Sequence, residues 1–378
     1  MPQLFEKTRI KSMELENRAV RSATWSAVAD DKGFVTDKAI DLYRELARGG
    51  VGLIVTGGQF VMPNGIGLPH MIGNYDDRQL EGLTRLVDAV HRDGGKIVPQ
   101  LVHWGIRANP ALFPQEGELW GPSGIEDPFS GNVPHEVTRD EITQLINAYA
   151  AAAARSKKAG FDGVQLHGSH GYGINQFLAR SSNWRTDRYG GDISNRYRFL
   201  GEVLEAVRGA VGEDYPVMIK LNVHDYVRDG LEPDEGVYIA KRLDADGIDA
   251  IEVTAGSRAS DDGMVPFRTK IKKPEDEGYL LELAVQVKEA VDVPVVTVGG
   301  FKSLEVIEGV LSAGKADYVA MCRPLIREPH LVNRWKRGDT KRATCISCNE
   351  CLGTGTLESA VHCAVERKLQ EKRAKKID

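Results

Sequence analysis

The sequence predicts an α/β protein: a (β/α)8 TIM barrel with a short C-terminal cysteine-rich extension. Eight short apolar segments recur along the chain and alternate with amphipathic ones. The apolar segments lack strict polar alternation, as expected for parallel strands that are buried on both faces. A GxGxxG turn, which usually follows an early strand in the rival doubly wound sheet, is absent from the sequence. The eight repeated units therefore favour the barrel.

Each predicted strand is an apolar run that ends in glycine or a polar residue. In chain order the strands span residues 18–24, 51–58, 96–103, 161–168, 215–222, 248–256, 293–300 and 316–323. Helical spacing of apolar residues predicts helices over residues 38–49, 79–93, 140–159, 195–211, 234–244, 281–291 and 303–313. Thr138 is a candidate N-cap, because acidic residues follow it in the first helical turn. Residues 325–339 are expected to close the barrel.

Composition is that of an ordinary globular protein and disfavours several classes of function. The chain has 378 residues, of which 42% are hydrophobic and 27% charged. That length suits a barrel domain over residues 1–338 and an extension over residues 339–378. A net charge of −5 gives no reason to expect a nucleic-acid surface. No apolar run is long enough to span a bilayer, and the N-terminus lacks a signal-peptide core, so we expect a cytoplasmic protein.

In a TIM barrel the residues at the C-terminal ends of the strands face the active site. Collected in chain order, these are Ala23, Thr24, Trp25, Gly57, Gly58, Gln100, His103, His167, His170, Tyr172, Lys220, Gly299, Gly300, Cys322 and Arg323. The last glycine pair together with Arg323 predicts a phosphate site. The earlier glycine pair would let a flat ligand lie against the backbone. Gln100 and Lys220 are candidates to hydrogen-bond one edge of a polar ring, where the lysine would also stabilise negative charge.

Motifs along nearly the whole chain resemble the Old Yellow Enzyme family of FMN-dependent ene-reductases, also known as NADH:flavin oxidoreductases. They are NRAVRSAT, GGVGLIVTGG, PQLVHWG, AGFDGVQLHGSHGYGINQFLARSSNWRTDRYGG, VMIKLN, VVTVGG and the region of Arg323. The resemblance implies FMN bound by the strand-end residues, with NAD(P)H as the electron donor. It also implies a small-molecule substrate with an activated C=C bond, of the enone or enoate type.

The resemblance assigns catalytic roles within the segment HGSHGY. His167 and His170 match the family positions that bind the substrate's carbonyl oxygen while flavin N5 delivers hydride to the β-carbon. Tyr172 matches the tyrosine that protonates the α-carbon. From the residues alone, the HxxH pair is also compatible with zinc, which needs further ligands, and Tyr172 with a packing role. His103 is also compatible with a buried histidine whose hydrogen bonds are satisfied, and residues 185–189 with loop pinning.

Three strand-end positions depart from the family pattern. Trp25 stands where several branches have a Cys or Thr that tunes the flavin, so Trp25 and Trp104 are expected to wall the substrate pocket. Lys220 replaces a common arginine, which keeps the charge but loses the bidentate fork. Cys322 replaces the glycine that commonly precedes the arginine matched by Arg323.

Four of the five cysteines follow the barrel, at the spacing Cys345-x2-Cys348-x2-Cys351-x11-Cys363. This spacing suits a 4Fe–4S cluster, while zinc and free thiols remain alternatives. It resembles the branch that includes dienoyl-CoA reductase and trimethylamine dehydrogenase. Larger members of that branch continue into FAD- and NAD-binding domains, which this sequence does not contain. A separate electron-donor protein is therefore a hypothesis, and the relatives suggest a homo-oligomer.

NAD(P)H-driven ene reduction is the predicted function, and three alternatives remain. The first is an iron–sulfur-linked flavin dehydrogenase acting on an amine or an enoyl thioester. The second is an electron-transfer subunit that needs a partner reductase. The third is a non-redox binder or isomerase of a phosphate ligand. Loops 109–134 and 257–275 are expected to select the substrate.

Overall fold

The eight predicted strands form a closed parallel barrel in the computed structural model, which describes residues 3–260, 263–358 and 360–374. The barrel strands are β3 (Ala19–Arg21), β4 (Leu53–Phe60), β5 (Ile97–Val102), β8 (Val164–Gly168), β9 (Val217–His224), β10 (Ala250–Ala255), β11 (Val295–Val298) and β12 (Tyr318–Met321). Around the barrel they follow the order β10-β11-β12-β3-β4-β5-β8-β9, and every paired neighbour is parallel. The predicted fold class is confirmed.

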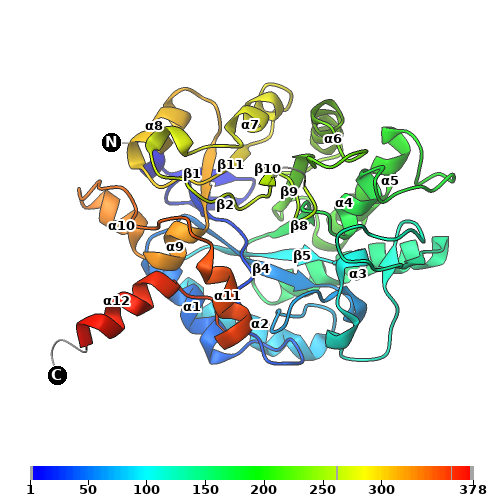
Figure 1. Cartoon of the computed structure of the whole chain (residues 1–378), viewed down its shortest axis with the longest axis horizontal. Helices are drawn as coiled ribbons and strands as arrows, with labels where there is room; N and C mark the ends of the chain where they lie inside the picture. Colours follow the sequence, from blue (N-terminus) through cyan, green and yellow to red (C-terminus); the bar gives the residue numbers. More distant parts are fainter. Residues whose placement is uncertain (1–2, 261–262, 359, 375–378) are drawn as a thin grey trace.

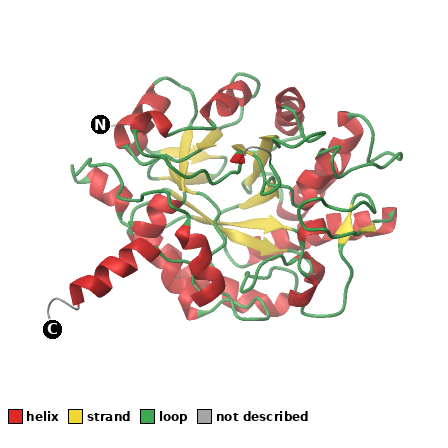
Figure 2. Ribbon diagram, in the orientation of Figure 1, coloured by secondary structure: helices red, strands yellow, loops and turns green. Residues whose placement is uncertain are grey.

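Helices surround this barrel (Figures 1 and 2). Those that overlap a predicted range are α1 (Asp37–Arg48), α2 (Leu80–Arg92), α3 (Arg139–Lys158), α5 (Ile193–Val211), α6 (Pro233–Ala245), α7 (Leu281–Lys288) and α8 (Leu304–Ser312). The predicted cap of α3 is confirmed. The Thr138 side chain accepts from the Glu141 amide, while the Glu141 carboxylate accepts from the Thr138 amide.

Several short elements were not predicted. β1 (Thr8–Ile10) and β2 (Met13–Leu15) form an antiparallel hairpin. Its apolar side chains belong to the same core cluster as residues of the barrel strands. The hairpin, which precedes β3 in the chain, therefore packs against the barrel. Strands of three residues are too short to show a periodic pattern. The loop after β5 carries two further short strands, β6 (Trp120–Gly121) and β7 (His135–Glu136), and α4 (Gly173–Leu178) follows β8.

The segment after α4 is fixed by buried charged groups, as its sequence indicated. Arg185 pairs with Asp187 at 2.8 Å and donates to the Val137 carbonyl at 2.7 Å. Tyr189 donates to Glu202 at 2.8 Å. These bonds pin the loop that follows the HGSHGYG segment, and they confirm a structural role for Arg185, Asp187 and Tyr189.

The chain beyond β12 returns over the mouth of the barrel. It forms α9 (Arg323–Arg327), α10 (Leu331–Lys336), α11 (Glu350–Glu358) and α12 (Ala364–Ala374). The Val361 amide donates to the Ser26 carbonyl at 2.9 Å, which ties this segment to the chain just after β3. α12 is exposed and projects from the body of the molecule (Figure 1). Within the described part of the chain, no helix has the length and apolar character to cross a membrane.

Candidate functional site

Three polar rings meet at the end of β8. The His167 ring centroid lies 5.4 Å from that of His170 and 5.3 Å from that of Tyr172, and both pairs meet edge-on. The chain makes a tight turn here, with His170 at φ 62° and Gly171 at φ 75°. A side chain at Gly171 would place its Cβ 2.2 Å from Arg107 Nη1, so only glycine fits. The sequence HGSHGY thus brings its two imidazoles and its phenol together.

Both imidazoles are uncharged at neutral pH. Burial, reinforced by the charge of Lys220, lowers the pKa of His167 to about 3. Burial also holds the pKa of His170 well below its ordinary value, with smaller contributions from Lys220 and His167. The pKa of Tyr172 is raised by burial, an effect that Arg258 and Arg107 partly offset. Neutral imidazoles and a protonated phenol can all donate hydrogen bonds to a substrate.

The lowered pKa values of His167 and His170 predict that the enzymatic rate does not change with pH around neutrality. Because both histidines remain neutral, kcat/KM for an enone should show no imidazole ionisation between about pH 5 and pH 8. The measurement is an anaerobic rate profile with saturating reductant, analysed for ionisations that affect the oxidative half-reaction. A limb with a midpoint near the ordinary histidine pKa would contradict the neutral assignment.

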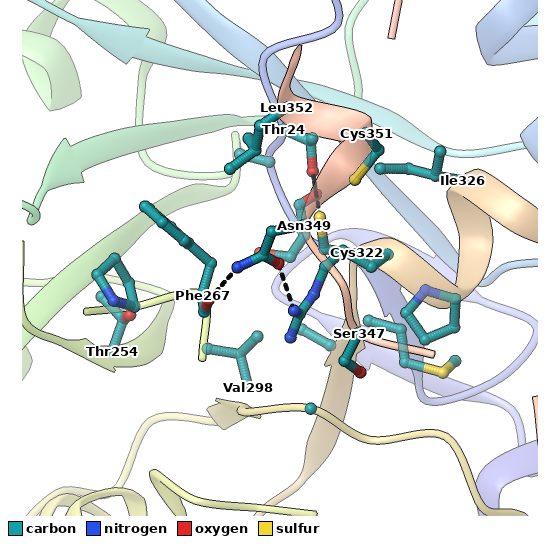
Figure 3. A pocket seen from close by; sticks show the side chains of 18 of the residues that line it. Thr24, Thr254, Phe267, Val298, Cys322, Ile326, Ser347, Asn349, Cys351 and Leu352 are labelled. Atoms are coloured by element: carbon teal, nitrogen blue, oxygen red, sulfur yellow. Dashed lines mark hydrogen bonds between the residues drawn. The ribbon is translucent and has the colours of Figure 1, made fainter. Parts of the chain in front are cut away.

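A cavity of about 210 Å³ opens beside these rings. Its walls come from the strand ends, from the loop after β10 and from the C-terminal segment (Figure 3). The predicted site residues that line it are Ala23, Thr24, Trp25, His170, Tyr172, Lys220, Gly300, Cys322 and Arg323. β8 stands across the barrel from β12. The cavity therefore reaches from the three rings to the residues that precede and begin α9.

The side of the cavity formed by β11 and β12 suits a phosphate group. Gly300 has φ 77°, and a Cβ there would lie 3.0 Å from the Tyr279 ring. Arg323 lines this side, as does Lys302, whose Nζ donates to the backbone carbonyls of Ile271 and Cys345. The cavity has four basic side chains and, among the described residues, no carboxylate in its lining. Cationic groups beside a glycine turn are the donor set that a phosphate requires.

A buried polar network extends beneath the cavity. Lys220 Nζ contacts Glu252 Oε1 at 2.9 Å and Ser22 Oγ at 2.8 Å. Gln165 donates to the other Glu252 oxygen at 2.9 Å and accepts from Gln100 at 2.8 Å. Burial alone would raise the pKa of Glu252, but Lys220 and the hydrogen bonds outweigh it, and the pKa is lowered. The carboxylate thus fixes the lysine head at the cavity floor.

Other predicted residues lie near the cavity without lining it. Gln100 belongs to the buried network, and His167 lies edge-on beside His170, which itself lines the cavity. Trp104 packs on Tyr172 with ring centroids 4.1 Å apart, whereas Trp25 itself lines the cavity. At Gly57 a Cβ would come within 2.7 Å of the Thr24 carbonyl, so that glycine permits close packing of β4 on the chain after β3.

Gly58, Gly299 and His103 likewise lie outside the cavity wall. A Cβ at Gly58 would meet Val102, and Gly299 has φ 148°, so both glycines serve the backbone. His103 accepts from the Gly105 amide and contacts Asn64 at 3.2 Å. Burial lowers its pKa to about 4. The alternative reading of His103 as a satisfied, buried histidine is confirmed.

Cys322 brings a thiol into the cavity from β12. Its Sγ lies 2.9 Å from Thr24 Oγ1 (Figure 3). Burial alone would raise the pKa of this thiol, but Arg21, the Thr24 hydrogen bond and Arg323 outweigh it, and the pKa is lowered. Trp25, after β3, is not a thiol. Cys322, at the end of the neighbouring strand β12, does place a thiol in the cavity.

The four clustered cysteines line a second, much smaller cavity. Arg323, Ile326, Asn349 and Cys351 line both cavities, so the two share a wall. Within the described residues, no group of three or more His, Cys, Asp or Glu side chains is arranged to hold a metal ion. The four thiols nevertheless line one common cavity.

Asn349, between two of these cysteines, was not predicted as a site residue. Its amide nitrogen donates to the Phe267 carbonyl at 2.7 Å, and its oxygen accepts from Arg323 at 2.6 Å (Figure 3). Arg323 also donates to the Arg268 carbonyl at 2.8 Å. One asparagine therefore joins the cysteine segment, the loop after β10 and the arginine of the phosphate side. No local pattern signals such a contact.

This barrel, with a cationic cavity wall across from neutral imidazoles and a phenol, matches a class of flavin enzymes. The chain belongs to the NADH:flavin oxidoreductase / NADH oxidase family, whose family model matches residues 3–342. The match spans all eight barrel strands. The resemblance to the NADH:flavin oxidoreductase family seen in the sequence is thus confirmed.

Individual relatives differ in how much of their length this chain covers. The NADH oxidase of Thermoanaerobacter brockii is 36% identical over 356 residues, covering 93% of this chain and 54% of the relative. The 4,4'-dithiodibutanoate disulfide reductase of Rhodococcus erythropolis is 31% identical over 403 residues, covering 100% of this chain and 98% of the relative. A solved 2-naphthoyl-CoA reductase complex with 2-naphthoyl-CoA superposes with a TM-score of 0.88 at 31% identity, covering 95% of this chain and 56% of that chain. This chain therefore spans about half the length of the first and third of these proteins.

Proposed function

We propose that this protein uses FMN and NAD(P)H to reduce an activated C=C bond conjugated to a carbonyl group. The observation that carries the proposal is the convergence of two neutral imidazoles and a protonated phenol, across the barrel from a cationic wall that has no carboxylate among the described residues. Gly300, Lys302 and Arg323 would hold the FMN phosphate, and Lys220 would bind an edge of the ring system. When bound, FMN supplies the hydride.

The histidines orient and polarise the substrate carbonyl. The Ser169 amide donates to His167 Nδ1 at 3.3 Å, so the ring proton of the neutral imidazole lies on Nε2. That N–H donates to the carbonyl oxygen and stabilises the charge that develops there. His170 Nε2 lies 3.1 Å from Thr254 Oγ1, which holds the second ring in place. Tyr172 carries a proton on its hydroxyl oxygen and delivers it to the α-carbon.

The direct test is an anaerobic titration of the purified protein followed by visible absorbance. NAD(P)H should bleach a flavin band, and 2-cyclohexenone should then restore it. A colourless protein with no affinity for added FMN would overturn the proposal and favour the isomerase alternative. Bleaching without reoxidation by any enone would instead favour the electron-transfer subunit.

We further propose that Cys345, Cys348, Cys351 and Cys363 ligate a 4Fe–4S cluster. The shared cavity lined by all four thiols, and by no carboxylate of the described chain, supports this proposal. Such a cluster exchanges single electrons, and its position next to the first cavity suits transfer to or from a flavin there. An electron-donor protein remains part of this proposal.

A cysteine variant tests the cluster. Cys348→Ser should lose iron and acid-labile sulfide, because a cubane needs its thiolate ligands. The matched control is Cys322→Ser, which removes the cysteine that lies outside the second cavity and should retain both. Iron and sulfide are assayed per mole of protein purified without air. Equal iron and sulfide in the Cys348 variant and the native protein would contradict the proposal.

Disulfide reduction is a second candidate function. It is favoured by the match to 4,4'-dithiodibutanoate disulfide reductase, which runs over nearly all of both chains. In that reaction two electrons and two protons convert one disulfide into two thiols, and NAD(P)H would supply the electrons. The same anaerobic titration with 4,4'-dithiodibutanoate in place of the enone separates the two candidates.

The remaining proposals concern the domain boundaries and the cellular location of the protein. We assign FMN binding to residues 1–338 and the cysteine cluster to residues 339–378. A cytoplasmic location would keep the five cysteines reduced and available as ligands.

A further inference from the structure

Four basic side chains line the large cavity, and three of them have partners or a proposed role. Lys220 is paired with Glu252 at 2.9 Å. Lys302 and Arg323 flank the glycine turn proposed to hold the FMN phosphate. The fourth is Arg258, in the loop after β10, which the proposed cofactor site leaves without a function.

Arg258 is close to the proposed catalytic groups. Its neighbour Ser257 forms a parallel backbone bridge with His170. Arg258 and Tyr172 line the same cavity, and the charge of this arginine acts on the Tyr172 hydroxyl. The residue is exposed, so its guanidinium lies toward the mouth while the imidazoles lie deeper.

Within the described residues, Arg258 makes no hydrogen bond or ion pair. Arg107, the other guanidinium near the rings, donates to the His170 carbonyl at 3.1 Å and pairs with Asp127 at 3.3 Å. Asp261 and Asp262 lie outside the described residues. The guanidinium of Arg107 is thus bound by other groups of the protein, whereas that of Arg258 is available to a ligand.

The charge of the other site groups restricts what this ligand can be. Neutral His167 and His170 can donate hydrogen bonds but do not neutralise a carboxylate, so they suit an uncharged carbonyl. The wall of the same cavity also includes Trp25 and Phe267. Aromatic side chains favour a planar, apolar segment of the substrate.

We propose that Arg258 selects substrates with a remote anionic group, a carboxylate or a phosphate, in addition to an uncharged conjugated carbonyl bound deeper in the cavity. This inference rests on the proposed function. It defines the substrate as a molecule with a neutral reacting end, a flat middle and a negatively charged outer end. A guanidinium binds both kinds of anion through paired N–H groups.

The test compares 4-(3-oxobut-1-enyl)benzoate with its methyl ester, which share the reacting enone and differ in outer charge. The native protein should have a kcat/KM for the acid about 10-fold or more above that for the ester, as expected for hydrogen bonds to a charged group. Arg258→Gln should bring this ratio near one, because it should lower kcat/KM for the acid much more than kcat/KM for the ester. Arg258→Lys should restore part of the preference.

Three further arms make the outcome decisive. The control Arg92→Gln removes the same charge in the last turn of α2, at the other end of the barrel, and should keep the native ratio. The corresponding aryl phosphate distinguishes a preference for phosphate from one for carboxylate. Calorimetric Kd values for acid and ester measure the preference without turnover. Equal ratios in the native and Arg258→Gln proteins would overturn the inference, whereas tighter binding of the acid without turnover of either compound would overturn only the proposed function.

Discussion

Tyr172→Phe should reduce kcat for enone reduction by about 100-fold or more, the usual scale for removing a positioned proton donor. The phenol lies at the edge of the His167 ring and lines the cavity, and its raised pKa keeps the proton in place at neutral pH. Phenylalanine preserves the packing on Trp104, so the loss should reflect the missing hydroxyl. The measurement is stopped-flow reoxidation of the reduced protein by 2-cyclohexenone.

The half-reaction with NAD(P)H provides the internal control. Flavin content and the rate of flavin reduction should be close to native in Tyr172→Phe, because neither requires the phenolic proton. Enone turnover at the native rate would rule out Tyr172 as the donor and leave it a packing aromatic.

Lys220→Met should lower the free energy of unfolding by about 3–5 kcal/mol, the cost of leaving a buried charge without its partner. Glu252 is fully buried, and the lysine supplies the positive charge next to it. Ser22 and Gln165 donate hydrogen bonds to the carboxylate, but they cannot neutralise it. Urea unfolding of the native and variant proteins, both saturated with or both stripped of FMN, measures the difference.

A second substitution separates charge from packing. Lys220→Met combined with Glu252→Gln keeps an acceptor for Gln165 and removes the orphaned charge, so most of the lost stability should return. A single variant as stable as the native protein would show that Lys220 does not stabilise the charged form of Glu252. That would contradict the lowered pKa of this carboxyl group.

The barrel and the cavity side facing β8 could be predicted because their signals are local. Buried parallel strands leave continuous apolar runs, and the HGSHGY turn keeps its rings within six consecutive residues. Glu252 had a signal as well: it is an acid within an otherwise apolar strand, which requires a buried partner. Lys302 had a signal too, because it is a basic residue that closely follows a glycine pair at a strand end.

Other features depend on contacts that no window of sequence contains. Asn349 matters because the chain beyond β12 folds back to the loop after β10, 82 positions earlier. The position of Gln100 was also beyond local reasoning. A glutamine at a strand end was expected to reach a ligand, whereas it donates to Gln165 on the neighbouring strand. The closed barrel places Gln165 next to Gln100, and this position determines the hydrogen-bond partner of the buried amide.

The segment that roofs the cavity has a consequence for assembly during synthesis. Ser347, Asn349, Leu352 and Val361 all line the large cavity, yet they leave the ribosome only after the eighth strand. A nascent chain can therefore complete the barrel while its mouth is still open on this side. The segment that carries Asn349 and the four clustered cysteines is therefore synthesised after every residue proposed here to hold the flavin.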